Sequence, residues 1–469
     1  MMIRVINVIL SLFPISGWIY LRILCILMTM CFGTETFAKR TIYDTEVQHE
    51  VQHIETMFSY ERCKYVIKKN HILQNRITIP VDCEICFEGG SLSGCITFTN
   101  TFLSGSVRLQ GSKIDGHVSN DIFRSEWLCY ADGIHDDADN INQMIGVCGN
   151  VHFGKGIYLM ESMHKAPIFE RVVSDDWQPF AHIGISKSDV KLVGDEQGVV
   201  FLSNKPSCMI CIYSTPYKID STIRNIDINN ITFRCQNDGK ELLQLKHTIK
   251  VVGVNGLKVR NCLFDDFWGD AICLHSYGDM PSTGERTRNI NVVIKNNHIK
   301  GGVHYKTRNG VAVVNGVNVR IENNLIEQTS GAGMPGAIDV EANSYAFSID
   351  KVIIKNNIIK NCKGTAGGIC INSKGFQAPA HNIMIIGNHI SGCTSGLAFV
   401  VQTENTTWNY VVKRNVIEAD TPPYQFVGEG KSKDWLFKNN VFKKGVSTRI
   451  PGKIQVERLI DKGNIFGKN

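Results

Sequence analysis

The sequence contains no block of lysine or arginine and no nucleic-acid-binding motif, and its formal net charge is only +6. The absence of such a block and motif sets nucleic acid aside as a partner. The weak positive charge is compatible with an acidic polymer such as a polyuronate. After residue 32 no apolar run is long enough to span a membrane. The Cys-x-x-Cys pairs Cys83/Cys86 and Cys208/Cys211 have no His or Cys partners at zinc-like spacing, so no metal site is predicted from them.

The N-terminus differs from the rest of the chain. Residues 7–32 are apolar apart from Arg22, and small residues follow at Thr36 and Ala38. This pattern predicts a signal peptide cleaved after Ala38, with an uncleaved anchor as the alternative because the run is long. We therefore expect an exported protein, located in the periplasm, at the cell surface or secreted, with no membrane contact once the signal is removed. Export permits disulfides, but the cysteine spacing does not demand them.

A short apolar-x-x-Asn-x-apolar segment recurs along the second half of the chain. Its clear copies are "VVIKNNHI" (292–299), "VRIENNLI" (319–326), "VIIKNNII" (352–359), "IMIIGNHI" (383–390), "YVVKRNVI" (410–417) and "WLFKNNVF" (435–442). Weaker copies are "IDINNITF" (226–233) and "LKVRNCLF" (257–264). The copies alternate with period two and are rich in Val and Ile, which is typical of strands. Short strands at steps of 25 to 35 residues predict a β-solenoid whose loops absorb the insertions.

An asparagine occupies the same place in each clear copy, at Asn297, Asn324, Asn357, Asn388, Asn415 and Asn440. Successive coils of a solenoid stack about 4.8 Å apart, so these amides are expected to bond one another as a ladder. Cys362 and Cys393 also share a register. We interpret them as stacked core thiols, with a disulfide left open.

The segment "YADGIHDDADNINQMIGVCGNVHFGKGIYLM" (130–160) resembles the opening of right-handed parallel β-helix proteins of the pectate-lyase superfamily. The resemblance covers about residues 125–445 and implies an all-β fold with a short N-terminal capping helix. Asp136 or Asp137 suits the N-cap of that helix, and Ala138, Ile141 and Ile145 lie on one of its faces. The superfamily includes lyases, hydrolases, epimerases and tailspikes, so the resemblance does not fix an activity.

The predicted organisation follows from these boundaries. It comprises a signal peptide (1–38), a linker (39–60), a small β-rich solenoid module (61–125), the right-handed parallel β-helix (126–445) and a C-terminal tail or cap (446–469). An exposed solenoid edge would allow a homotrimer, so we expect a monomer or a homotrimer.

A second strand follows each asparagine turn, and "GAIDVEAN" (336–343) is one of these strands. With Ile338 inward, Asp339 and Glu341 share the outward face about 6.6 Å apart, and Asn372 lies one coil from Glu341. Alignment of the inward residues Ile272, Val311, Ile338, Ile369 and Leu397 places Cys273, Ala312, Asp339, Cys370 and Ala398 in one outward column.

The carboxylate pair has three interpretations. Asp339 and Glu341 could be the acid and base of a glycoside hydrolase, because inverting enzymes hold their carboxyls about 6.5–9.5 Å apart. They could instead hold calcium with help from Asn343 and support a lyase. They could also form a solvated polar strand face without chemistry. The hydrolase needs no cofactor, and calcium belongs to the second interpretation.

A lyase or epimerase acting on a uronate needs a base and a cation that stabilises the enolate. His275 or Tyr305 is the candidate base, and Arg308 is the candidate cation. Substrate-binding candidates are Asn372, Lys374, Tyr305, Lys306, Tyr277 and Trp408, the aromatic ones because such rings stack on sugars. Neither the Arg-x-Pro-x-x-Arg signature of lyases nor the complete Asp set of polygalacturonases is present, although "DDFWGD" (265–270) is similar to part of the latter.

The leading prediction is therefore an exported enzyme that cleaves glycosidic bonds of a polysaccharide, with Asp339 and Glu341 as acid/base pair and His275 and Arg308 assisting. The alternatives are a polysaccharide lyase or uronate epimerase and a non-catalytic carbohydrate-binding or adhesive β-helix.

Overall fold

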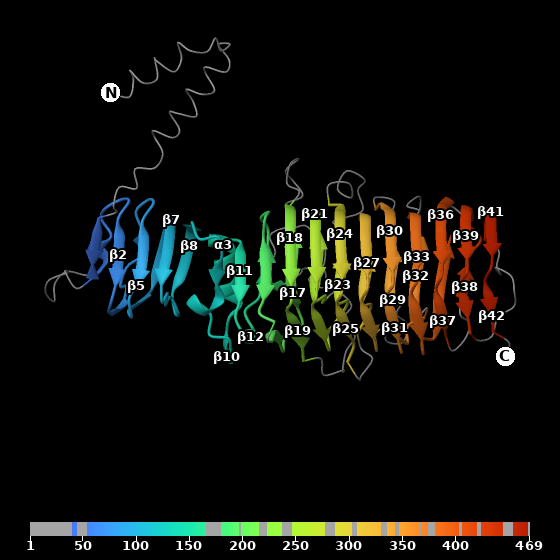
Figure 1. Ribbon diagram of the computed structural model, residues 1–469, viewed down its shortest axis with the longest axis horizontal. Coiled ribbons are helices and arrows are strands. Elements are labelled where there is room, and N and C mark those ends of the chain that lie inside the picture. Colours follow the sequence, from blue (N-terminus) through green and yellow to red (C-terminus); the bar gives the residue numbers. More distant parts are fainter. Residues whose placement is uncertain are drawn as a thin grey trace, which may run out of the picture.

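The computed structural model describes residues 40–44, 54–165, 180–196, 198–214, 223–236, 246–276, 287–302, 307–329, 335–342, 347–365, 367–373, 380–402, 406–419, 424–443 and 454–467. Within these ranges the chain forms one elongated stack of strands that runs in sequence order from one end to the other (Figure 1). The predicted signal peptide lies outside the described residues.

Three long sheets form the main body, a right-handed parallel β-helix, as predicted. The first contains β9 (Phe123–Arg124), β11 (Asn150–Phe153), β15 (Lys191–Gly194), β18 (Ile223–Asn229), β21 (Val254–Arg260), β24 (Asn289–Lys295), β27 (Gly316–Glu322), β30 (Ile349–Lys355), β33 (Ala380–Ile386), β36 (Thr406–Lys413), β39 (Lys431–Lys438) and β41 (Gln455–Lys462).

The second sheet contains β10 (Asp132–Asp136), β12 (Gly156–Met160), β16 (Val199–Ser203), β19 (Thr232–Cys235), β22 (Leu263–Asp265), β25 (His298–Lys300), β28 (Leu325–Glu327), β31 (Ile358–Lys360), β34 (His389–Ser391), β37 (Val416–Glu418), β40 (Val441–Phe442) and β42 (Ile465–Phe466). The asparagine turns join the first sheet to this one, so each coil repeats the same path.

The third sheet, called the site sheet below, contains β13 (His164–Lys165), β14 (Phe180–Ile185), β17 (Cys208–Tyr213), β20 (Ile249–Val252), β23 (Ile272–Leu274), β26 (Val311–Val313), β29 (Gly336–Glu341), β32 (Gly367–Ser373), β35 (Ser395–Val401) and β38 (Tyr424–Val427). Its strands pair in parallel except β13 with β14.

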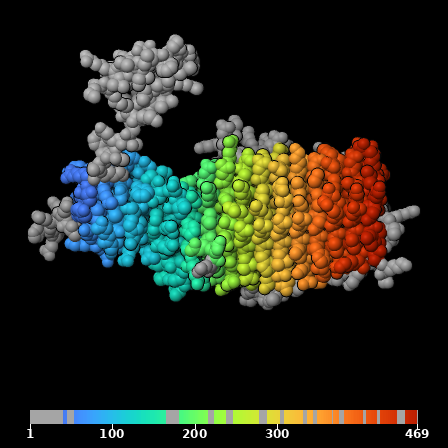
Figure 2. Space-filling model, viewed as in Figure 1, coloured from blue at the N-terminus to red at the C-terminus, as the bar shows by residue number. Residues whose placement is uncertain are grey.

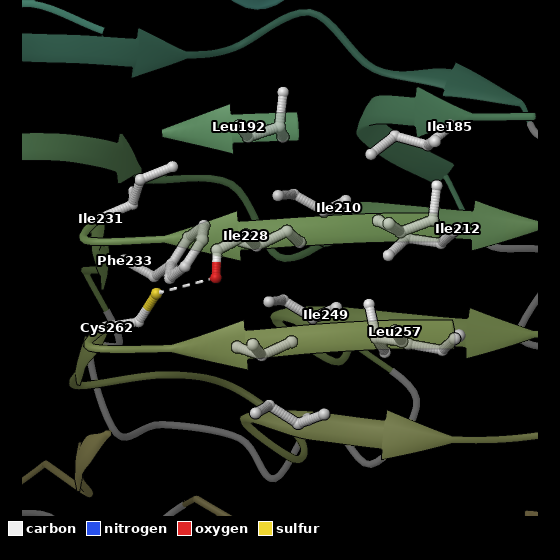
Figure 3. Close-up of a cluster of buried hydrophobic side chains, with 14 of the residues drawn as sticks. Ile185, Leu192, Ile210, Ile212, Ile228, Ile231, Phe233, Ile249, Leu257 and Cys262 are labelled. Carbon is white, nitrogen blue, oxygen red and sulfur yellow. Dashed lines mark hydrogen bonds between the residues drawn. The ribbon is translucent and has the colours of Figure 1, made fainter. Parts of the chain in front are cut away.

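Inward Ile, Val, Leu and Phe side chains from all three sheets fill the space between them. Figure 3 shows this core in the middle of the chain, where Ile210, Ile228 and Ile249 of adjacent coils point to the interior and the Cys262 thiol donates to the carbonyl of Ile228 at 3.9 Å. Each coil buries its apolar face against the coils before and after it. Figure 2 shows the coils stacked in sequence order along the molecule.

The asparagine ladder is confirmed. The backbone N–H and Nδ2 of Asn324 both donate to Oδ1 of Asn357, at 3.0 and 2.9 Å, and the same pattern links Asn357 to Asn388. The ladder begins where the N–H of Cys262 donates to Asn297, and it continues past Asn440 to Asn464, a rung that the repeat analysis missed. Cys362 and Cys393 are free buried thiols, which confirms the first interpretation of that pair.

The capping helix α3 (Ala138–Val147) is present, with Ala138, Ile141 and Ile145 buried as predicted. Oδ1 of Asp136 accepts the N–H of Ala138 at 3.1 Å, whereas the Asp137 carboxylate binds the preceding loop through the N–H groups of Tyr130 and Ala131. The helix packs against β8 and β14, between the two solenoid parts (Figure 1).

The N-terminal module is a smaller parallel stack. It contains β1 (Thr41–Tyr43), β2 (Lys64–Ile67), β5 (Glu84–Phe87), β7 (Cys95–Gly105), β4 (Ile77–Thr78) and β8 (Lys113–Val118), with β3 (Asn70–Ile72) paired to β6 (Ser91–Ser93). Two 3-10 turns accompany these strands, η2 (Ile54–Met57) and η3 (Ser125–Trp127). β1 falls in the segment expected to be a linker, and β41 and β42 extend the helix into the expected tail.

Candidate functional site

The register of the site sheet matches the predicted one. Ile272 pairs with Val311, Val311 with Ile338, Ile338 with Ile369, and Ile369 with Leu397, and all five side chains are fully buried. The adjacent residues Cys273, Ala312, Asp339, Cys370 and Ala398 are therefore in register on the opposite face. Glu341 pairs with Asn372, which places the amide beside the carboxylate as expected.

The outward face at Asp339 is not open, in contrast to the expected sugar-accessible or solvated surface. The side chain of Asp339 is 0% exposed. Neighbouring positions are covered by Phe347, which packs with Cys273, Ala312 and Val314 in a second apolar cluster outside the core. Alternation along a strand predicts which face a residue occupies, but not whether a loop residue returns to cover it.

Asp339 and Glu341 have different protonation environments. Burial raises the pKa of Asp339 well above its usual range, and the negative charge of Glu341 raises it further, while Arg308 opposes the shift. Neither carboxyl oxygen of Asp339 has a hydrogen-bond partner as a carboxylate, but in its protonated form it can donate to Glu341. Glu341 is partly exposed and accepts a bond from Nδ2 of Asn372 at 3.5 Å. The pair thus combines a fully buried carboxyl group, whose pKa burial raises, with a partly exposed one.

Arg308 lies beside this pair, and its side chain forms an ion pair with Asp270. Its Nε is 3.4 Å from Oδ1 of Asp270, and the side chains of Arg308 and Asp270 are 17% and 2% exposed. The same oxygen accepts the N–H of Asn309 at 3.0 Å. Asp270 chiefly, and then Cys273, Glu341 and Asp339, raise the pKa of Arg308, because a nearby negative charge favours the cation.

Burial alone would raise the pKa of Asp270, but the charges of Arg308 and His247 outweigh it, so the pKa is lowered and Asp270 is ionised. Asp270 thus provides a fixed counter-charge for Arg308.

His275, which follows β23, is a neutral imidazole. Its Nδ1 lies 2.6 Å from the carbonyl oxygen of Ser276, which can only accept, so Nδ1 carries the proton and Nε2 a lone pair. Burial and then the charge of Lys250 lower the pKa of His275 to about 3. A base this weak is poorly matched to abstraction of a carbon-bound proton near neutral pH.

Trp408 lies away from this cluster. It belongs to β36 in the first sheet, is 40% exposed, and stacks on His381 with ring centroids 3.0 Å apart. The expectation that it lies in a loop beside the site sheet is therefore wrong, because the strand begins two residues earlier. Tyr277, Tyr305, Lys306, Lys374 and Asn343 lie outside the described residues.

Sequence reasoning missed His247, Asp270 and Lys250, which lie close to Arg308. His247 is next to Asp270 at 3.1 Å, and Lys250 pairs with Cys273 in the next coil. Asp270 ends the "DDFWGD" segment, and this segment was the signal in the sequence that could have identified Asp270 as a site residue. His247 and Lys250 precede the first recognised site-sheet strand, since the short strand β20 has no asparagine turn before it.

No protein-family model and no curated protein matches the chain. Solved structures with a similar fold include PfbA, a surface adhesin of Streptococcus pneumoniae, at 14% identity and a TM-score of 0.44, covering 72% of this chain and 90% of that one. A PL6 alginate lyase complexed with a trisaccharide matches at 13% identity and a TM-score of 0.38, covering 91% and 96%. Endopolygalacturonase I from Stereum purpureum matches at 12% identity and a TM-score of 0.25, covering 86% of this chain and 95% of that one.

These similarities concern the fold alone. The sheet topology defines a parallel β-helix protein. In the described part of the chain, no helix has the length and apolar character needed to cross a membrane.

Proposed function

We propose that this protein is an exported, polysaccharide-active enzyme that cleaves glycosidic bonds by hydrolysis, with Asp339 as general acid and Glu341 as general base. The observation that carries the proposal is the unequal environment of the pair: Asp339 is fully buried with a raised pKa, while Glu341 is partly exposed at the edge of the site. Two carboxyl groups whose environments separate their pKa values are the usual basis for acid and base roles in glycoside hydrolysis.

In this mechanism Asp339 gives its proton to the glycosidic oxygen as the bond to the anomeric carbon breaks. Glu341 takes a proton from a water molecule that attacks the same carbon. An inverting enzyme needs about 6.5–9.5 Å between its carboxyls, whereas Asp339 is close enough to Glu341 to donate to it when protonated. The proposal therefore requires substrate to uncover Asp339 and to displace the Glu341 side chain from it.

A second candidate is a polysaccharide lyase that uses calcium. Both carboxyl oxygens of Asp339 and Oδ1 of Asn372 are buried without a hydrogen-bond partner, and oxygen donors of this kind suit calcium. Asp339, Glu341 and Asn372 would hold the ion, which would neutralise a uronate carboxylate when bound. The positive charge of Arg308 acts against such an ion, and the low pKa of His275 makes it a poor base, so we rank this function second. A non-catalytic carbohydrate-binding or adhesive β-helix is the third.

The experiment is a digest of neutral and acidic polysaccharides by the purified full chain, with and without a chelator. Reducing ends and the ultraviolet absorbance of unsaturated uronates are followed in parallel. Hydrolysis gives reducing ends without absorbance and does not respond to the chelator. A chelator-sensitive rise in absorbance would replace the hydrolase with the lyase, and glycan binding without turnover would leave the binding module.

A further inference from the structure

A second cluster of chemically capable side chains lies next to the carboxylate pair. His247, Asp270 and Cys273 each offer a ligand atom, and these atoms all lie within 4.8 Å of one another. All three residues are at most 2% exposed. None of them belongs to the acid/base pair, and the cluster goes beyond the proposed function.

The stacking of two coils brings these residues together. Ile249 of β20 pairs in register with Ile272 of β23. His247 and Asp270 each precede these partners by two residues, and Cys273 follows by one. Cys273 lies within β23, and His247 and Asp270 lie in the connections that lead directly into β20 and β23, so the register of the two strands brings the three residues together.

The two carboxylate oxygens of Asp270 contact different groups. Oδ1 accepts the N–H of Asn309 at 3.0 Å and faces Arg308 at 3.4 Å. Oδ2 faces Nδ1 of His247 at 3.1 Å. Oδ1 is therefore held by groups outside the cluster, as the carboxylate ligands of metals usually are, while Oδ2 faces the cluster.

One nitrogen of His247 faces Asp270, and the other has no partner. Nδ1 lies 3.2 Å from the N–H of Asp270 and 3.1 Å from its carboxylate oxygen Oδ2. Either a proton on Nδ1 or a cation between the two side chains satisfies the contact with Oδ2. Nε2 of His247 is buried and has no hydrogen-bond partner, so the contact with Asp270 alone leaves this nitrogen unsatisfied.

We propose that His247, Asp270 and Cys273 form a site for a zinc ion. An imidazole nitrogen, a carboxylate oxygen and a thiolate sulfur are the three ligand types that zinc accepts together, whereas calcium and magnesium prefer oxygen alone. Three protein ligands leave a fourth coordination position for water or another group.

The surrounding charges limit the affinity of this site. Arg308 and Lys250 both act on His247 as positive neighbours, and like charges oppose a divalent cation. Removing the Lys250 charge in Lys250→Met should therefore tighten zinc binding.

The test uses the metal-free purified full chain and Zn²⁺ as the probe, with bound metal measured after dialysis. We expect about one equivalent per chain, and Co²⁺ in its place should show the ultraviolet sulfur-to-cobalt charge-transfer band. Cys273→Ser should lose the band and the bound metal. Cys370→Ser is the matched control, because Cys370 is a buried thiol in the same outward column and lies outside the cluster.

Thermal unfolding with and without Zn²⁺ keeps the test decisive if a variant folds poorly. Zinc should raise the melting temperature of the wild type and of Cys370→Ser, but not that of Cys273→Ser. Retention of zinc by Cys273→Ser at the wild-type level, or the absence of zinc binding by the wild type, would overturn the proposal. Either result leaves the carboxylate hypothesis untouched, because polysaccharide cleavage is measured separately.

Discussion

Asp339 and Glu341 stand two positions apart on β29, and the first is fully buried while the second reaches the edge of the site and accepts a bond from Asn372 at 3.5 Å. Burial, and then the charge of Glu341, favours a proton on Asp339. This asymmetry makes two like residues a candidate acid and a candidate base.

The stability of the protein should depend on the protonation of Asp339. Its folded pKa lies above the unfolded value of about 3.9, so the folded chain holds the proton more tightly between those two values. The stabilisation is complete below about pH 4 and is lost as the pH rises through the folded pKa. Asp339→Asn removes this dependence. In urea unfolding, the free energy of unfolding of the wild type should therefore fall relative to that of the variant as the pH rises from 4. Parallel curves for the two proteins would contradict the raised pKa.

His275 should behave in the opposite sense. Its folded pKa is about 3, below the unfolded value of about 6.5, so the unfolded chain binds the extra proton first as the pH falls. The wild type should therefore lose free energy of unfolding relative to His275→Gln between about pH 6.5 and 3. A histidine NMR titration checks this directly, and a His275 midpoint near 6.5 would refute it.

The asparagine ladder should contribute strongly to stability. Nδ2 of Asn357 donates to the carbonyl of Ile321 at 2.9 Å and to Asn388 at 3.0 Å, while its Oδ1 accepts two bonds from Asn324. Asn357→Ala leaves several buried groups unpaired, so we expect a loss of roughly 2–4 kcal/mol in urea unfolding. Asn464→Ala, at the half-exposed last rung, is the control and should cost less. Equal losses of unfolding free energy in Asn357→Ala and Asn464→Ala would mean that the buried ladder bonds are not the cause of the loss.

The ion pair of Arg308 with Asp270 should be visible in a double-mutant cycle. Asp270→Asn removes one partner of a buried pair and should cost about 3 kcal/mol, because the Arg308 charge loses its counter-charge. In Asp270→Asn/Arg308→Met the loss should be smaller than the sum of the two single losses. Additive losses would show that the two side chains are not coupled.

Much of the fold follows from residues that can be read in the sequence. Asn324 and Asn357 mark the turns, and the alternation around Ile338 correctly predicts the pairing of Glu341 with Asn372. These features repeat from coil to coil, so each copy supports the next.

The site is less predictable because its decisive contacts are not repeated. Phe347 covers Ala312 from outside the strand pattern, and His247 approaches Asp270 from a coil without the asparagine signature. Nothing in the local sequence of "GAIDVEAN" indicates that Asp339 would be enclosed. The burial that raises the pKa of Asp339 is therefore a property of the folded coils and not of its own strand.

The most direct measurement is the release of reducing ends from the best polysaccharide of the panel by the wild type, Asp339→Asn, Glu341→Gln and the control Asp195→Asn. Asp195 follows β15 in the first sheet, and its side chain is 46% exposed. Loss of the acid or the base should lower turnover by about 10²–10⁴-fold, while the control should retain wild-type activity and all four should unfold cooperatively. Undiminished cleavage by either Asp339→Asn or Glu341→Gln would contradict the assignment of this pair as the catalytic acid and base.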